Sequence, residues 1–398
     1  MRRLFVVLCA LLVYGSFYPW QFRWTNGISL QQALLRVFQS WPAEYSTGIL
    51  QDISLNLVVY IPLGLIGYLA AGRYTRGAFQ WTRLGSPILS GFLLSLFVET
   101  IQSYVPSRVP SALDLVCNTA GAAIGVVIGV LYEAVISRVL TRAEIHLKMR
   151  PSSALMMLIV FAAQMSMPTV LRGYEWFLHT YSGPDIVDLI TRESRNAFAF
   201  AMATWLFAAR FLEVMVSSYA KASLKLHWLK TLACLAMIAA AIYLIRITNP
   251  LTDTEWKGAA AGALLYALTT LICPGAVRDW LLAIAALAWL VGDGLRPYWF
   301  VGRNHFEWIP FLGMLGANWL GSVTSLITKT WMYGSAFWIW ERAGISPSVC
   351  AAILLLVLAA IEYAQLSLPG RISTMTDLAM GAISIGLLWG VERKYSKA

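Results

Sequence analysis

An apolar helical hairpin around residue 105 carries a group of polar side chains that could do chemistry. These residues are Glu99, Gln102, Arg108, Asp114 and Asn118. Glu99 and Gln102 are three positions apart and Asp114 and Asn118 are four apart, so each pair shares one helix face. Both arms of the hairpin are apolar enough to lie in lipid, where a charged side chain is costly and is usually retained for function. The group is therefore a candidate binding or acid–base site.

A second row of polar side chains precedes the hairpin. Asp52, Asn56 and Tyr60 follow one another at intervals of four, which places them on one face of a helix. Pro62 follows and predicts a bend in that helix. If the helix enters the membrane from the side on which the hairpin turns, Asp52 and Asn56 reach the depth of Glu99. We therefore expect three helices to contribute to one polar cluster.

Two interpretations of this cluster are open. In the first it is a scaffold: Arg108 neutralises Glu99 or Asp114, Asp114 caps its own helix, and the polar contacts fix the helices. In the second it is a site. Arg108 then anchors a phosphate or carboxylate headgroup, and Glu99 or Asp114 is the candidate catalytic acid or base.

The composition is that of a membrane protein. Of the 398 residues, 59% are hydrophobic and 13% are charged, whereas soluble globular chains carry about 25% charged residues. A net charge of +10 would favour nucleic acid as the partner of a soluble chain, but in a membrane protein it is typical of loops that face anionic lipid. No basic helix interleaved with aromatic residues is present, so nucleic acid is excluded as a partner.

No motif in the sequence points to a cofactor or to a metal. The five cysteines form no C-x-x-C pair, and the four histidines have no ligand spacing. G-x-S-x-G, Walker and G-x-G-x-x-G motifs are absent from the sequence. We therefore expect neither a cofactor nor a metal.

Twelve segments have the length and composition of a membrane helix. They are residues 4–20, 49–71, 87–105, 114–136, 154–171, 197–219, 229–248, 257–273, 280–298, 322–342, 347–367 and 376–391. With the N-terminus inside, the cytoplasmic segments hold 17 Lys and Arg residues and the outer segments hold 10. The positive-inside rule then favours two cytoplasmic termini and a polar hairpin that turns on the outer face.

Two further patterns concern packing against lipid and between helices. The loop 21–48 contains an apolar side that predicts an amphipathic helix on the outer leaflet. That side is formed by Leu30, Leu34, Leu35, Val37, Phe38 and Trp41. Gly121, Gly125 and Gly129, at intervals of four, predict a close contact between their helix and a neighbour.

The polar hairpin has a counterpart near the other end of the chain. A shift of 263 positions without a gap places Glu99, Gln102, Arg108 and Asp114 on residues of the same type. The counterparts are Glu362, Gln365, Arg371 and Asp377. Because the polar residues match while the apolar ones differ, we interpret the second hairpin as part of an internal repeat that carries a second candidate site.

The residues of the first hairpin and the preceding helix resemble the motifs of the VanZ-like family. That family carries a D-x3-N-x3-Y/F-x-P-L-G helix, then E-x2-Q, a P-x-R loop and an aspartate-led helix with N-T-x-G-x3-G. The matching residues are Asp52, Asn56, Tyr60, Pro62, Leu63, Gly64, Glu99, Gln102, Pro106, Arg108, Asp114, Asn118, Thr119, Gly121 and Gly125. The resemblance covers roughly residues 4–136. A degenerate second copy at about 280–391 lacks P-L-G and has Gly381 in place of Asn118.

The resemblance implies a multi-pass protein of the bacterial plasma (inner) membrane and cell envelope. The founding member of the family is linked to low-level resistance to the glycopeptide teicoplanin. We expect an all-α fold of about twelve transmembrane helices, with two parallel four-helix repeats and a four-helix spacer. The expected domains are 1–150, which is VanZ-like, 151–279, which is the spacer, and 280–398, which is the degenerate repeat.

Three functions are compatible with an outward polar cluster. The first is binding of an anionic amphiphile, such as a lipid headgroup, a lipid-linked glycan or a lipoglycopeptide. The second is an enzyme that transfers or hydrolyses such a headgroup at the same face. The third is a transporter built from parallel repeats, which is disfavoured because few polar residues line a path through the spacer. Membrane lipids are the expected partners in each case.

Overall fold

The computed structural model of the protein describes residues 2–24, 27–42, 47–71, 80–131, 152–177, 197–219, 227–246, 251–296, 305–316, 319–368 and 371–392. Contacts divide the chain into two compact units. Unit 1 comprises Met1–His146 with Phe177–Thr180, and unit 2 comprises Leu147–Trp176 with Tyr181–Ala398. Each unit has its own packed helices and is considered by itself.

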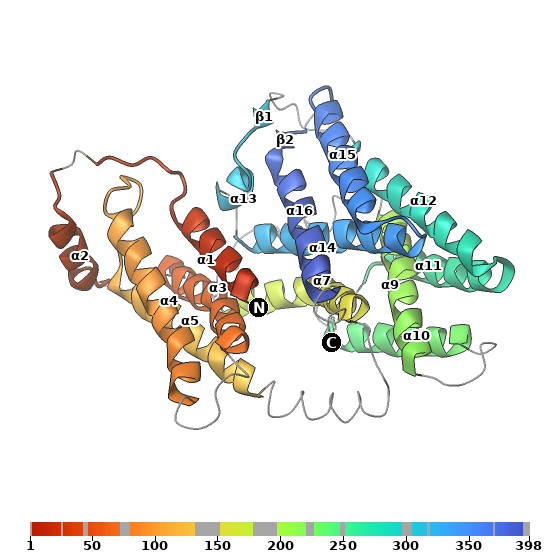
Figure 1. The fold of residues 1–398 in the computed structure, drawn as a ribbon, viewed down its shortest axis with the longest axis horizontal. Coiled ribbons are helices and arrows are strands. Elements are labelled where there is room, and N and C mark those ends of the chain that lie inside the picture. The colour runs from red at the N-terminus through yellow and green to blue at the C-terminus, as the bar shows by residue number, and fades with distance from the viewer. Residues whose placement is uncertain are drawn as a thin grey trace. The chain divides into compact units, whose positions relative to one another are not determined.

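Unit 1 contains five helices in its described residues (Figure 1). They are α1 (Arg2–Ser16), α2 (Leu30–Gln39), α3 (Thr47–Ala71), α4 (Gln80–Gln102) and α5 (Ala112–Leu131). The most extensive contact joins α3 to α5, and α4 packs on both of these helices. α1 packs mainly on α3, while the short helix α2 lies against α4 and α5.

The glycine stripe of α5 makes the contact with α3 possible. Gly121 lies against the carbonyl of Leu57 and Gly125 lies against the carbonyl of Ile61, so a Cβ at either glycine would collide with the α3 backbone. Gly129 meets an aromatic ring of the same helix. Small residues let two membrane helices approach closely, and the predicted packing role of the stripe is confirmed.

Helix α2 is the amphipathic helix predicted in the loop 21–48. Ser29 and Gln32 form a capping box that fixes its first turn, since each side chain bonds to the backbone N–H of the other residue. Ala33 and Val37 are fully buried against the rest of unit 1, so Val37 does not lie on the lipid-facing side where it was expected. The exposed apolar residues are Leu30, Leu34, Leu35, Phe38 and, just beyond the helix, Trp41.

Unit 2 contains nine helices and one pair of two-residue strands in its described residues (Figure 1). The helices are α7 (Ser152–Phe177), α9 (Ala197–Tyr219), α10 (His227–Ile245), α11 (Asp253–Ile272), α12 (Gly275–Gly294), α13 (Leu312–Gly316), α14 (Trp319–Arg342), α15 (Pro347–Gln365) and α16 (Met375–Glu392). Strands β1 (Phe306–Glu307) and β2 (Ser373–Thr374) pair in parallel. The core of the unit is rich in aromatic side chains, with Trp331, Phe207 and Phe211 fully buried.

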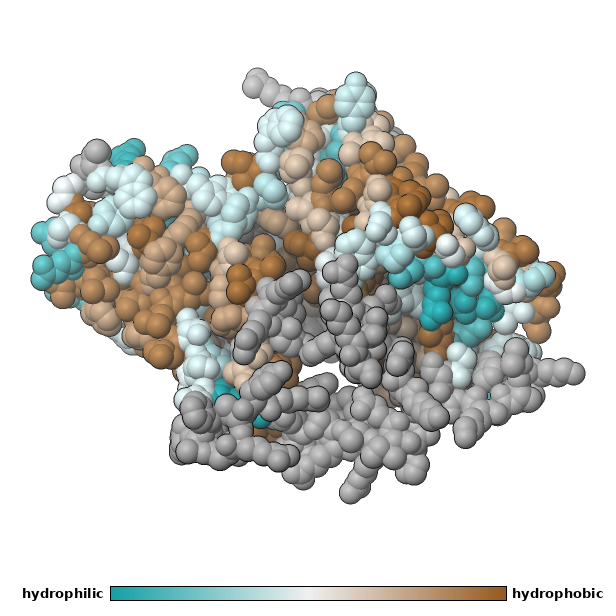
Figure 2. All heavy atoms as spheres, viewed as in Figure 1, coloured by the Kyte–Doolittle hydropathy of each residue, from teal (hydrophilic) through white to brown (hydrophobic). Residues whose placement is uncertain are grey.

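The all-α membrane fold is confirmed. Each of the twelve predicted spans corresponds to a helix, and seven of these helices are long and apolar enough to cross a membrane, as judged by length and composition. Helices α1, α7 and α16 contribute shorter apolar stretches of 10–17 residues, while α11 and α14 are not among the candidates. Figure 2 shows apolar side chains over α4 in unit 1 and over α12 and α15 in unit 2.

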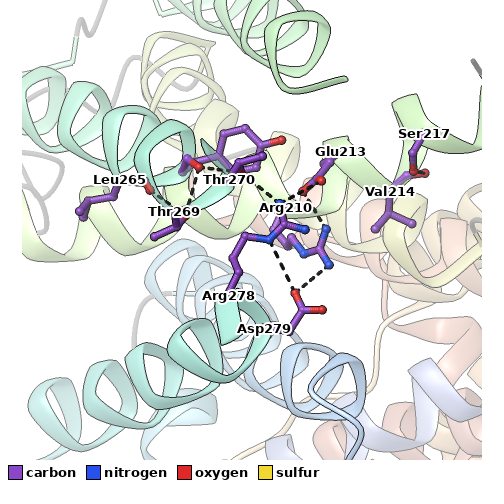
Figure 3. A network of polar contacts seen from close by, with 10 residues as sticks. Arg210, Glu213, Val214, Ser217, Leu265, Thr269, Thr270, Arg278 and Asp279 are labelled. Atoms are coloured by element: carbon purple, nitrogen blue, oxygen red, sulfur yellow. Dashed lines mark hydrogen bonds and ion pairs between the residues drawn. The ribbon is translucent and has the colours of Figure 1, made fainter. Parts of the chain in front are cut away.

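A network of four charges joins α9 to α12 in unit 2, and one hydrogen bond extends it to α11 (Figure 3). Arg210 on α9 contacts Glu213 and Asp279, each at 2.7 Å, and Arg278 on α12 contacts Glu213 at 3.2 Å. Arg278 also donates to the hydroxyl of Thr270 on α11 at 3.1 Å. The pairing of Arg210 with Glu213 follows from their spacing of three. Two positive and two negative charges balance within the network, as buried charges require.

Candidate functional site

The predicted polar residues of unit 1 lie at the ends of three packed helices. Asp52 and Asn56 belong to the first half of α3, Glu99 and Gln102 to the last turn of α4, and Asp114 to the first turn of α5. The Asp114 carboxyl lies within electrostatic range of Asp52, Glu99 and Arg108, and within hydrogen-bonding reach of Asn56. The structure therefore brings the cluster together. Asp52 is exposed, whereas Glu99, Gln102 and Asn118 are buried.

Glu99 holds the connection between α4 and α5. Its side chain is buried, with the residue 3% exposed, and its carboxylate accepts a 2.9 Å hydrogen bond from the backbone N–H of Ser111. A carboxylate that accepts a bond from backbone satisfies a donor that would otherwise be unpaired. Glu99 thus fixes the position of the residues that immediately precede α5.

Ser111 supplies the cap of α5 that was predicted for Asp114. The hydroxyl of Ser111 accepts the backbone N–H of Asp114 at 3.3 Å. A serine in this position satisfies one of the free N–H groups of the first helical turn because its short side chain can fold back on the backbone. The Asp114 carboxyl is directed instead towards the cluster, where Asn56 lies within reach.

Gln102 and Arg108 tie the hairpin to the end of α1. The Gln102 amide donates to the carbonyl of Ser16 at 2.9 Å, and the Arg108 Nε donates to the carbonyl of Tyr18 at 3.1 Å. Helix carbonyls near a C-terminus have no partner within the helix, so these side chains supply the missing donors. Only Nε of the Arg108 guanidinium is used in this way, and the side chain is exposed.

Asn118 lies deeper in unit 1. Its amide Nδ2 donates to the Ser95 hydroxyl on α4 at 2.9 Å, while its Oδ1 is buried and has no hydrogen-bond partner in the part of the chain that the structure describes. Asn118 therefore links α4 to α5 and does not take part in the bonds that anchor the hairpin.

The Arg108 charge lies within electrostatic range of both Glu99 and Asp114 but makes no close contact with either carboxylate. Among the described residues, no ion pair joins Arg108 to either carboxylate. Within the same residues, no group of three or more His, Cys, Asp or Glu side chains is arranged to hold a metal ion. The polar cluster of unit 1 therefore combines scaffold bonds with one arginine whose charge is not matched by a contacting carboxylate.

The second set of polar residues, in unit 2, makes the same three hydrogen bonds. Glu362 accepts the backbone N–H of Thr374 at 2.6 Å, Gln365 donates to the carbonyl of Gly294 at 2.7 Å, and Arg371 Nε donates to that of Arg296 at 2.8 Å. Thr374 is Ser111 shifted by 263 positions. The carbonyl acceptors Gly294 and Arg296 lie 278 positions after Ser16 and Tyr18, the acceptors in unit 1.

The second set differs from the first in how its charges are used. Asp377 is paired with Lys329 of α14. Arg371 uses a second nitrogen, Nη2, to donate to the Asp293 carbonyl at 2.6 Å. Gly381 stands at the position of Asn118 and has no polar side chain.

A cavity of about 360 Å³ adjoins the cluster of unit 1. It is lined by Arg36, Gln39, Ser40, Ser103, Arg108, Val109 and Pro110. Only Arg108 among these was predicted as a site residue. Arg36 could have been found from its position on the polar side of the predicted amphipathic helix, but the sequence does not show that this helix docks beside the hairpin.

The helices and their apolar surfaces define a polytopic all-α membrane protein. Residues 5–133 match the family model described as VanZ/LLP1, which confirms the resemblance seen in the motifs. The matched part of the chain includes most of α1 and all of α2 to α5. No curated protein and no solved structure matches the chain.

Proposed function

We propose that the protein binds an anionic amphiphile at the polar end of unit 1. The ligand class includes a lipid headgroup, a lipid-linked glycan precursor and a lipoglycopeptide. All three combine a negatively charged polar part with an apolar chain. The polar part would contact Arg108 and the neighbouring polar residues, and the chain would lie along the apolar helix surfaces.

The Arg108 guanidinium is the observation that carries this proposal. One nitrogen bonds to the Tyr18 carbonyl, which sets the direction of the side chain. Its terminal nitrogens have no hydrogen-bond partner among the described residues, and the carboxylates within its electrostatic range, Asp52, Glu99 and Asp114, make no contact ion pair with it there. Planar guanidinium groups recognise phosphate and carboxylate through two parallel hydrogen bonds, so a positioned arginine with unoccupied terminal nitrogens suits an anionic ligand.

The orientation of the chain supports access from outside the cell. The excess of Lys and Arg in alternate loops favours two cytoplasmic termini, which places the connection between α4 and α5 on the outer face. We place the protein in the bacterial plasma membrane on this basis. Lipid-linked precursors of the envelope and glycopeptide antibiotics are both accessible from that face.

The residues of unit 2 from α12 onward form, in this proposal, a degenerate second copy of the VanZ-like domain. The three hydrogen bonds shared by the two polar sets support a common origin, because bonds at corresponding positions recur although the apolar sequence differs. In the second copy, Asp377 forms an ion pair with Lys329, and Arg371 makes a second hydrogen bond to the backbone. No corresponding contact is made by Asp114 or Arg108 within the described residues of the first copy. The second copy is therefore assigned a structural role.

Lipids retained during purification test the proposal. The full-length protein is extracted from its native membrane in a mild non-ionic detergent, and bound lipids are identified by mass spectrometry. Anionic lipids should be enriched over the membrane average with the wild type and lost in Arg108→Gln. The control Arg23→Gln removes the same charge from a nearby exposed position and should retain them. Retained lipid that follows the bulk composition in all three proteins would refute the proposal.

A lipoglycopeptide ligand makes a separate prediction in cells. If the site affects teicoplanin action, cells that carry Arg108→Gln at normal expression should differ in teicoplanin sensitivity from cells that carry the wild type. Cells with Arg371→Gln should change less, because that arginine is committed to backbone carbonyls. Equal sensitivity of all three strains would exclude the glycopeptide and leave the lipid ligands.

A further inference from the structure

We propose that Arg36 and Arg108 form a two-arginine pocket for the phosphate group of a membrane lipid. This inference rests on the proposed function and specifies its ligand as a phosphate-bearing headgroup. It also adds Arg36, Gln39, Ser40 and Ser103 as residues that contact the ligand.

The lining of the cavity has the chemistry of an anion site. Two arginines, one glutamine and two serines are among the residues of its wall, and no acidic residue is. The volume of about 360 Å³ exceeds that of a phosphate group alone and leaves space for the polar atoms attached to it. Arginine is favoured where phosphate is recognised because its donors match two phosphate oxygens at once.

Both arginines are carried by segments that the fold holds in place. Arg36 lies in the last turn of α2, which is fixed by its capping box and by the burial of Val37. The end of α2 is bonded to the start of α5, since the Ser40 carbonyl accepts the backbone N–H of Ala112 at 2.9 Å. Arg108 is held by its bond to Tyr18. Both arginines are therefore held beside the same cavity, and no acidic residue lines it.

Ser103 provides an independent sign that the cavity receives a polar ligand. Its hydroxyl oxygen is buried and has no hydrogen-bond partner in the part of the chain that the structure describes. A buried hydroxyl without a partner is unfavourable, and such groups call for a specific explanation. A phosphate oxygen in the cavity would accept this hydroxyl and remove the penalty.

The surroundings of the cavity indicate that the phosphate belongs to a lipid. Helix α2 presents Leu34, Leu35 and Phe38 to the outside next to Arg36, and Val109 of the cavity wall is 80% exposed. Exposed apolar side chains of this kind lie at the boundary between headgroups and acyl chains when an amphipathic helix rests on a leaflet. A headgroup in the cavity would place its acyl chains beside these residues.

Binding of short-chain lipids to the purified full-length protein tests the inference. Dihexanoyl phosphatidic acid, dihexanoyl phosphatidylcholine and inorganic phosphate are titrated by calorimetry below the lipids' micelle-forming concentrations. Phosphatidic acid should bind more tightly than either of the other two. Arg36→Gln should weaken phosphatidic acid binding tenfold or more, Arg36→Lys should weaken it less, and Arg23→Gln should leave it within about twofold because Arg23 does not line the cavity.

The outcomes separate this inference from the proposed function. Unchanged binding by Arg36→Gln, together with loss in Arg108→Gln, would overturn the two-arginine pocket and leave the anionic site. Binding of inorganic phosphate as tightly as phosphatidic acid would overturn the assignment to a lipid. An absence of any anionic lipid binding by the wild type would overturn both. Thermal unfolding of each variant shows whether a loss of binding is due to misfolding. Ser103→Ala removes only one hydroxyl and should also weaken the binding of phosphatidic acid.

Discussion

The four-charge network of unit 2 allows a quantitative test of how buried charges hold helices α9 and α12 together. Arg210 and Asp279 are 2.7 Å apart, and their side chains are 11% and 16% exposed. In Asp279→Leu, two arginines would face the single carboxylate of Glu213. Removal of one partner from a buried pair typically costs about 3–5 kcal/mol because the other charge is left without compensation. Allowing for partial exposure, we expect a loss of about 3 kcal/mol, and a similar loss for Arg210→Met.

The double variant Arg210→Met with Asp279→Leu should be no less stable than either single variant. It removes one charge of each sign and leaves the pair of Arg278 and Glu213 at 3.2 Å. Apolar side chains of similar size often replace a buried ion pair without loss. A double variant that loses about 3 kcal/mol or less gives a coupling of about −3 kcal/mol or more negative, because the two single losses sum to about 6 kcal/mol.

The assay is equilibrium unfolding of the full-length protein in detergent micelles, followed by tryptophan fluorescence as denaturant is added. The same measurement on all four proteins closes the double-mutant cycle. A double variant that loses the sum of the two single losses would show that the charges act independently. The network in Figure 3 would then be a set of separate contacts and not a balanced unit.

Three shorter predictions concern unit 1, and the first uses a control position in unit 2. Gly125→Val should destabilise the protein by about 2 kcal/mol or more because its side chain meets the α3 backbone, whereas Gly292→Ala, which has open space, should be neutral or slightly stabilising; thermal unfolding compares them. Glu99→Leu should cost about 2 kcal/mol since it leaves the Ser111 N–H without its acceptor, and Glu99→Gln, which retains one, should cost less in the same assay. In a cysteine-free background, Arg108→Cys should react with an impermeant thiol reagent in intact cells, and protection from it would reverse the proposed orientation.

Much of this architecture could be predicted from the sequence. Apolar runs of membrane length located the helices, because a segment in lipid must satisfy its backbone internally and must be long enough to span the bilayer. The interval of four between Gly121 and Gly125 predicted the close contact of α5 with α3, since small residues on one face leave space for a neighbouring backbone. Polar residues within apolar runs likewise identified the cluster around Glu99.

The partners of those polar residues could not be predicted in the same way. Glu99 and Arg108 are nine positions apart and opposite in charge, which suggested a mutual pair, yet each bonds to backbone: Glu99 to Ser111 and Arg108 to Tyr18. Nearly every residue carries a backbone N–H and C=O, so the sequence does not show which of these groups will bond to a side chain. Arg36 was missed for a related reason, because the docking of α2 beside the hairpin depends on tertiary contacts.

The most direct test of the central claim is photochemical crosslinking at Val109 in intact membranes. Val109 lines the cavity of unit 1 and is 80% exposed, so a p-benzoylphenylalanine residue can replace it without loss of core packing. The matched control is Ile372, which is Val109 shifted by 263 positions and is 48% exposed. Irradiation should attach phosphate-bearing or other anionic amphiphiles at position 109 well above their share of the membrane, and should not do so at position 372. Adducts that mirror the bulk lipid composition at both positions would contradict the account.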